Sequence, residues 1–166
     1  MRRTIISLAA LSMIASTSLA EAQSKPGLAE RRAIAAYTEA QYPSLQKKIQ
    51  QAAGFDVPIN VDWDSLALPG DAEYYPQDDY FVKTIFGPIE AALAQIAKDD
   101  MGKSALKESL KEIKVQYEDG GIPATAYGDR VKFDGGVLTV NFRPYTNTAD
   151  VEDRTNAILK VLEASL

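Results

Sequence analysis

The chain has 166 residues, of which 46% are apolar and 25% charged, and its formal net charge is −5. This balance is typical of a globular domain and excludes a collagenous, low-complexity or wholly disordered chain. The sequence contains neither cysteine nor histidine, which excludes Ser-His-Asp and Cys-His catalysis, disulfides, Cys/His zinc sites and the usual haem ligands.

The first 22 residues have the pattern of a secretory signal peptide. Arg2 and Arg3 precede a largely apolar run at 5–15, and small residues then lead to Ala20-Glu21-Ala22, an A-x-A cleavage pattern. The apolar run is too short for a membrane-spanning helix, which needs about 20 residues. We therefore expect cleavage after Ala22, with Ala20 as the second choice, and a periplasmic or secreted location for a single domain at 23–166.

The charge of the expected mature chain limits its partners. Cleavage would leave 16 basic and 22 acidic side chains, and this negative balance argues against nucleic acid, because phosphate binding requires a basic surface. No later segment is apolar for long enough to span a bilayer. We expect no cofactor and no resident metal.

The first elements of the domain are predicted to be two helices and a strand. Residues 28–41 are rich in alanine and free of glycine and proline, and their apolar side chains recur with helical spacing. Residues 44–53, after Pro43, repeat that spacing and end at Gly54, a residue suited to a left-handed C-cap. Residues 57–64 alternate between apolar and polar side chains, which predicts a strand with one buried face.

The central part of the chain is predicted to be a loop followed by helices. The loop covers residues 67–79, and Asp78 or Asp79 is expected to cap a helix that runs through Ile85. Gly87-Pro88 should kink or restart this helix. We expect Gly102 to end it and Ser104 to cap a short following helix.

The rest of the chain predicts strands and a final helix. Apolar and β-branched residues alternate at 113–117, 125–127, 131–133 and 137–142, and glycine-containing turns separate the last three runs. Asp134-Gly135-Gly136 indicates a tight hairpin, which needs positive φ. Residues 148–166 have the pattern of an amphipathic helix. The sequence thus predicts an α+β fold, an antiparallel sheet of four to five strands packed by N-terminal, central and C-terminal helices.

Asp62 and Asp64 form a candidate carboxylate pair. Two residues apart on the expected strand, they would share a face with Cα atoms about 6.6 Å apart. That separation suits glycoside hydrolysis, and it also suits a Ca²⁺ site completed by oxygens of Asp71 or Glu73. The pair would equally serve as the solvated face of an edge strand, where charge discourages edge-to-edge pairing.

The segment 70–80 concentrates acidic and tyrosine side chains. Tyrosine offers rigid amphipathic contact area, and carboxylates attract cationic partners, so such a loop suits recognition. The alternative is a solvated connection whose tyrosines fold back on the core. The candidate residues for binding a partner or ligand are Asp62, Asp64, Asp71, Glu73, Tyr74, Tyr75, Asp78, Asp79 and Tyr80.

These features lead us to expect an exported, soluble, non-catalytic binding protein of the cell envelope. It would engage an envelope protein or a small cationic ligand through the acidic, tyrosine-containing loop; a specific inhibitor of a secreted enzyme is a variant of this hypothesis. The alternative is a carboxylate-type hydrolase that acts on glycan or cell-wall material with Asp62 or Asp64 and a loop acid. Its general acid would need a pKa raised by burial.

Overall fold

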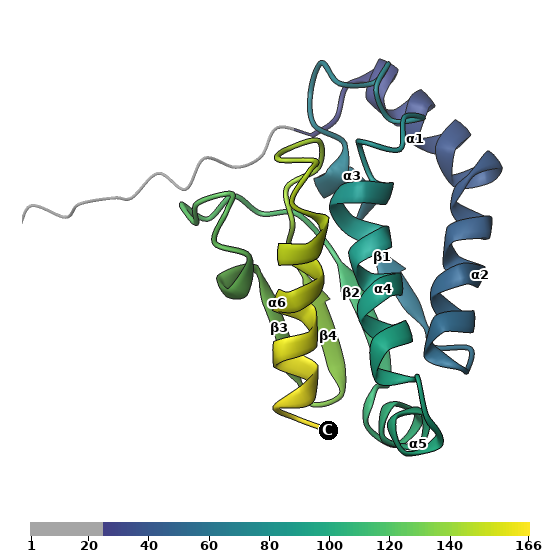
Figure 1. Cartoon of the computed structure of the whole chain (residues 1–166). Helices are drawn as coiled ribbons and strands as arrows, with labels where there is room; N and C mark the ends of the chain where they lie inside the picture. The colour runs from purple at the N-terminus through teal and green to yellow at the C-terminus, as the bar shows by residue number, and fades with distance from the viewer. Residues whose placement is uncertain (1–24) are drawn as a thin grey trace, which may run out of the picture.

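A computed structural model describes residues 25–166, so the predicted signal peptide at 1–22 lies outside the described residues. The described chain is a mixture of helices and one four-stranded sheet (Figure 1). The helices are α1 (Leu28–Ala40), α2 (Tyr42–Ala53), α3 (Trp63–Leu66), the π-helix η1 (Val82–Phe86), α4 (Gly87–Ile96), α5 (Asp100–Ser109), the 3-10 helix η2 (Tyr127–Arg130) and α6 (Val151–Glu163). The strands are β1 (Ile59–Val61), β2 (Glu112–Val115), β3 (Val131–Asp134) and β4 (Val137–Val140).

The sheet is mixed, so the prediction of an antiparallel sheet was wrong. The strand order is β1-β2-β4-β3, in which β1, β2 and β4 are parallel and only β3 runs antiparallel, to β4. Only β3 and β4 are joined by a tight turn, where Gly135 and Gly136 have φ values of 57° and 89°. The connection from β1 to β2 contains α3, η1, α4 and α5, which provides the long crossover that parallel pairing needs.

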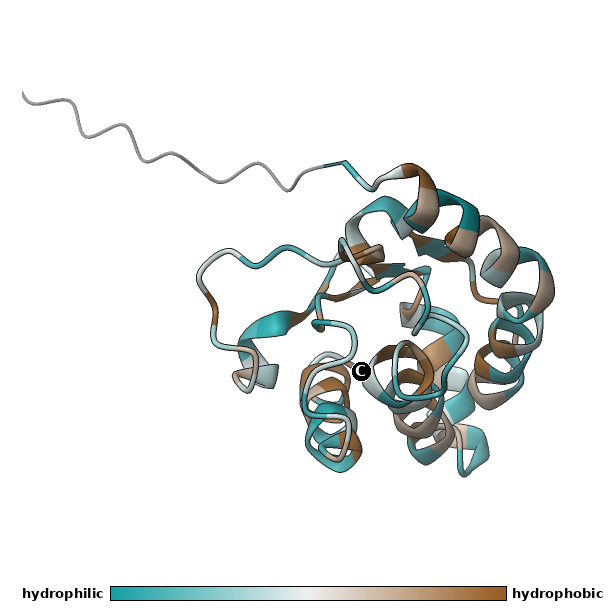
Figure 2. Ribbon diagram, turned by 90° about the horizontal axis from the view of Figure 1, so that it is seen from above, coloured by the Kyte–Doolittle hydropathy of each residue, from teal (hydrophilic) through white to brown (hydrophobic). Residues whose placement is uncertain are grey.

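One face of the sheet is covered by helices and the other faces solvent. In β2 the buried Ile113 and Val115 alternate with the exposed Lys114. Helices α4 and α6 pack together on the side of the buried residues and are seen nearly end-on in Figure 2. The opposite side, here called the open face, carries Asn60, Glu112, Lys114, Gln116, Lys132, Asp134, Val137, Thr139 and Asn141.

The predicted helices are confirmed except around α5. Gly54 has a φ of 83° and is the left-handed C-cap of α2, and α4 restarts at Gly87 directly after η1. No side-chain cap precedes η1, so the expected cap at Asp78 or Asp79 is absent. Gly102 does not end a helix: it lies inside α5, whose N-cap is Asp99 rather than Ser104. The Asp99 carboxylate accepts a hydrogen bond from the Gly102 N–H (2.8 Å).

The predicted strand at 125–127 is lost, and those at 57–64, 113–117 and 137–142 end earlier than expected, at Val61, Val115 and Val140. The strand expected at 57–64 is reduced to Ile59–Val61. The strand expected at 125–127 does not form. The Ala126 N–H instead donates to the Pro123 carbonyl (3.0 Å), and the Asp129 N–H donates to the Ala126 carbonyl (3.0 Å). No helix within residues 25–166 is both long enough and apolar enough to cross a bilayer.

Candidate functional site

The loops that follow β1, β2 and β4 lie at one end of the molecule, the upper end in Figure 1, because these strands are parallel. In open α/β sheets this carboxyl end is where ligands bind. The loop after β1 is strongly acidic: residues 62–80 contain six acidic side chains and no lysine or arginine. All nine candidate residues from the sequence belong to this segment, so the fold brings them to one end of the sheet.

The expectation that Asp62 and Asp64 share a strand face was wrong. Strand β1 ends at Val61, and Asp62 is the N-cap of α3, where its Oδ1 accepts a hydrogen bond from the Ser65 N–H (3.2 Å). The short aspartate side chain is well suited to capping, so the chain turns into a helix here. Asp64 lies in the first turn of α3, and both carboxylates are exposed. The strand geometry from which the carboxylate pair was predicted is therefore absent.

The capping turn joins the loop after β1 to the loop after β2. The Ser65 hydroxyl donates to the Asp62 carbonyl (2.7 Å) and accepts a hydrogen bond from the Tyr117 N–H (2.9 Å). The Tyr117 hydroxyl in turn donates to the Asp119 carboxylate (3.0 Å). This chain of bonds fixes two of the three loops relative to each other.

Two of the loop tyrosines fold back into the core. Tyr75 and Tyr80 are fully buried, and burial raises the pKa of both phenols. The Tyr75 hydroxyl donates to the Leu68 carbonyl (3.0 Å), and the Tyr80 hydroxyl donates to the Asp71 carboxylate (3.2 Å). These residues stabilise the loop, so they are not available for contact with a partner.

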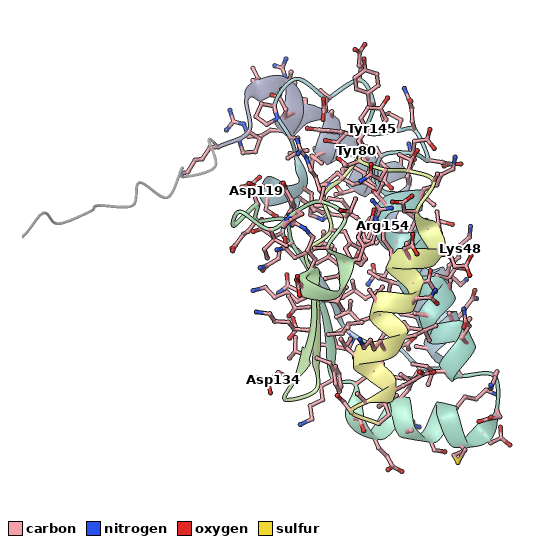
Figure 3. The ribbon with its side chains drawn as sticks, turned by 60° about the vertical axis from the view of Figure 1, so that its left-hand side comes forward. Lys48, Tyr80, Asp119, Asp134, Tyr145 and Arg154 are labelled. Carbon is pink, nitrogen blue, oxygen red and sulfur yellow. The ribbon has the colours of Figure 1, made fainter. Side chains whose placement is uncertain are left out.

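Tyr74 remains at the surface and belongs to a stack of three rings. The Tyr145 ring stacks on Tyr74 (centroids 5.1 Å apart, planes at 14°) and on Tyr80 (5.5 Å, 19°). Tyr145 is 40% exposed and adopts a left-handed backbone, with a φ of 52°. Its N–H donates to the Tyr80 carbonyl (3.2 Å). The stack therefore fastens the loop after β4 to the loop after β1, as Figure 3 shows for Tyr80 and Tyr145.

The buried Arg154 holds the left-handed backbone beside this stack in place. Asn147 also has a positive φ, 49°, and such a conformation costs about 1 kcal/mol or more for a residue with a side chain. The Arg154 guanidinium, 1% exposed, donates to the carbonyls of Thr146, Asn147 (2.8 Å) and Asp150 (3.2 Å) and lies over the Tyr127 ring. Burial lowers the pKa of Arg154. Figure 3 places it directly below Tyr80 and Tyr145.

A second buried charge ties the acidic loop to the N-terminal helix. Glu30, in the first turn of α1, is 9% exposed, and its carboxylate accepts a hydrogen bond from the Gly70 N–H (3.0 Å). This bond and further backbone N–H groups hold the pKa of Glu30 below its usual range. The loop after β1 is thus anchored at both ends, to α1 through Gly70 and to Tyr145 through the ring stack.

The acidic side chains of the loop differ in whether they form hydrogen bonds or ion pairs with other residues. Asp71 is bonded to Tyr80, and Asp79 forms an ion pair with Lys83. Glu73 is exposed, and its hydrogen bond to Tyr74 raises the pKa of that phenol. Asp78 is exposed and has no side-chain hydrogen bond or ion pair to another residue of the described chain. Glu73 and Asp78 are therefore the acids best placed to meet a partner.

The candidate residues lie at the surface and line neither of two hollows found among the described residues. One hollow of about 400 Å³ lies between η2 and α6, beside Tyr127 and Asp150; the other, of about 200 Å³, lies on the open face. Neither is lined by any of the nine candidate residues. Across the part of the chain that the structure describes, no three carboxylates gather closely enough to hold a metal ion.

The comparisons with known proteins give no relative. No protein-family model, no curated protein and no solved structure matches this chain.

Sequence reasoning missed Tyr145, Asn147 and Arg154. Nothing in the local sequence marks the backbone of Tyr145 as left-handed, because its partners are about 70 residues away in the chain. Arg154 did carry a signal: it lies on the same helical stripe as the apolar Val151 and Ile158, where a charged side chain is unexpected.

Proposed function

We propose that this protein is exported and acts as a non-catalytic binding protein of the cell envelope, which docks a cationic region of another protein. The docking surface, called here the tyrosine–acid surface, consists of Asp71, Glu73, Tyr74, Asp78, Asp79 and Tyr145. The observation that carries the proposal is the partly exposed Tyr74–Tyr145 pair, with ring centroids 5.1 Å apart, next to acidic side chains of the segment 62–80, which contains no basic residue.

The chemistry of this surface favours recognition of a cation. The rings of Tyr74 and Tyr145 are already ordered by stacking, so a partner loses little further side-chain entropy on contact. The ring of Tyr74, at the end of the stack, and the neighbouring carboxylates both attract guanidinium or ammonium groups. Asp62 and Asp64, on the adjoining α3, add negative charge at the same end of the molecule. A charged surface of this kind also steers the approach of an oppositely charged partner.

A hydrolytic function finds less support in this geometry. Its motivation was two carboxylates on one strand face, and Asp62 and Asp64 instead lie in an N-cap and a first helical turn, both exposed. A general acid needs burial to raise its pKa. A small cationic ligand in place of a protein partner would use the same surface and is an outcome that the following experiment distinguishes.

The test uses two variants with the same change in net charge. Glu73→Gln with Asp78→Asn removes two exposed acids from the tyrosine–acid surface. Glu108→Gln with Asp134→Asn removes two exposed acids from the opposite end of the molecule and serves as the matched control. Asp71 and Asp79 stay unchanged because they bond to Tyr80 and Lys83, and Glu73→Gln keeps a side-chain oxygen that can accept the hydrogen bond of Tyr74. Tagged mature proteins are incubated with envelope lysate and with an immobilised lysine- and arginine-rich peptide.

We expect the surface variant to lose most of the capture and the control variant to bind like the wild type. The amount of partner captured should also fall as the salt concentration rises towards about 0.5 M, because salt screens the interaction between exposed charges. Equal binding by the surface variant and the wild type would refute the proposal. An equal loss in both variants would also refute it, because net charge and not this surface would then explain the binding. Capture of the basic peptide without any lysate protein would favour the small cationic ligand.

A further inference from the structure

The hollow of about 200 Å³ on the open face is built from three different parts of the sheet region. Its floor contains Gln116, Thr139 and Asn141, its wall is the loop after β2, and Lys132 and Asp129 border it on the β3 side. Lys132 and Thr139 are directly opposite each other in the β3–β4 ladder, so their side chains project from the same face. The volume is below the roughly 300–1,000 Å³ of sites for drug-sized molecules, so an occupant must be small.

The wall of this hollow is rigid because a buried arginine organises it. Arg130 is 2% exposed, and its guanidinium donates to the carbonyls of Glu118 (3.3 Å), Pro123 (3.2 Å) and Asn141 (3.1 Å), among others. The Asn141 side chain clamps the same loop, accepting from the Glu118 N–H (2.7 Å) and donating to the Glu118 carbonyl (3.1 Å). The hollow is therefore formed before any ligand arrives, which lowers the entropic cost of binding.

Charges of both signs line the hollow without neutralising each other. Lys132, Glu118 and Asp129 all line it, yet none of the ion pairs within residues 25–166 involves these three side chains. The side chains of Gln116 and Thr139 likewise have no hydrogen-bond partner in that part of the chain. A single ion of either sign would meet repulsion from one side of the hollow, whereas a ligand with both charges satisfies both sides.

We propose that this hollow binds a small zwitterion of the α-amino-acid type. The ligand carboxylate contacts the Lys132 ammonium and the Thr139 hydroxyl, and the ligand ammonium lies between Glu118 and Asp129. The site is independent of the tyrosine–acid surface, because the two share no residue and lie on different loops. Figure 3 shows the wall loop, marked by Asp119, at the upper end of the strands, with Asp134 at the lower end.

The probes are alanine and two analogues that each lack one of its charged groups. Propionate retains the carboxylate without the amine, and ethylammonium retains the amine without the carboxylate. Each is titrated into ¹⁵N-labelled mature protein, and amide shifts of Gln116, Glu118, Thr139 and Asn141 are followed by NMR. Alanine should give saturable shifts there, and each analogue should bind about tenfold more weakly, since each lacks one charge-assisted contact. Absence of saturable shifts with alanine, or equal binding of either analogue, would overturn the proposal.

Two variants separate this site from a general charge effect. Lys132→Gln should weaken alanine binding about tenfold, to the level of ethylammonium, while leaving ethylammonium binding unchanged. Lys114→Gln is the matched control, because Lys114 lies opposite Thr139 on the other neighbouring strand of the open face and does not line the hollow. Unchanged alanine binding in Lys132→Gln, or an equal loss in Lys114→Gln, would refute the assignment. The amide spectra themselves verify that both variants are folded.

Discussion

Replacing Gly102 by alanine sets local helix preference against tertiary packing. Gly102 lies inside α5, where alanine is intrinsically favoured over glycine by about 1 kcal/mol. A Cβ at this position, however, would overlap the carbonyl oxygen of Ile96 at the end of α4 and lie 2.8 Å from its carbonyl carbon. Carbon atoms in contact are normally about 3.5–4.0 Å apart, so α5 would have to move by about 1 Å.

The structure therefore predicts that Gly102→Ala destabilises the protein. Overpacking of this kind costs about 1–3 kcal/mol, and displacing the Gly102 N–H from its 2.8 Å bond to Asp99 removes part of an N-cap worth about 1 kcal/mol. After the gain of about 1 kcal/mol in helix preference, the free energy of unfolding should fall by about 1–3 kcal/mol. For a domain of this size, Tm should fall by about 4–10 °C.

Urea unfolding followed by the fluorescence of Trp63, the single tryptophan, measures this change. Gly128→Ala is the matched control, because a Cβ there would meet no atom within 4 Å, and its stability should change by less than about 0.5 kcal/mol. If Gly102→Ala were as stable as the wild type or more so, the close approach of α5 to the end of α4 would be refuted.

Four further predictions follow from buried groups and from the expected leader. Because the pKa of Glu30 is lowered in the folded protein, its carboxylate stabilises the fold above about pH 4.5, and this contribution is lost as pH falls. Between about pH 5 and pH 3, Tm should therefore drop less steeply in Glu30→Gln than in the wild type. Burial raises the pKa of Tyr42 to about 12, so its neutral phenol favours the fold below about pH 10, and this contribution is lost as pH rises through 12. Tyr42→Phe should therefore remove one late step from the alkaline absorbance titration. It should not lower stability at neutral pH, because the hydroxyl has no hydrogen-bond partner in the described chain. Arg154→Met should cost about 3 kcal/mol in urea unfolding, since it leaves buried carbonyls of the loop after β4 unpaired, and a loss below about 1 kcal/mol would contradict this role. N-terminal sequencing of the full-length chain after expression in cells should begin at Gln23; a protein that retains residues 1–22 would contradict the predicted cleavage.

The candidate site shows where sequence reasoning stops. The acidic, tyrosine-containing segment was recognisable because its composition is local, but the roles of its members were not. Tyr75 and Tyr80 became part of the core, whereas Tyr74 stayed at the surface and gained Tyr145 as a partner from the far end of the chain. An aspartate at position 62 would suit either a strand face or a helix N-cap, and in the folded chain its hydrogen bond from the Ser65 N–H makes it an N-cap.

Short-range patterns predicted α1, α2, α4 and α6, the Gly135–Gly136 hairpin and the left-handed cap at Gly54, because each depends on residues within a few positions of one another. They did not predict α3, η2 or the start of α5. The pairing of β1 with β2, and of β2 with β4, depends on strands separated by long connections, and no local signal states whether such strands run parallel. The buried Arg130 and Arg154 are also products of the tertiary structure. Each buried guanidinium is satisfied by backbone carbonyls 4–12 residues away in the chain, and only the folded loops aim those carbonyls at a single side chain.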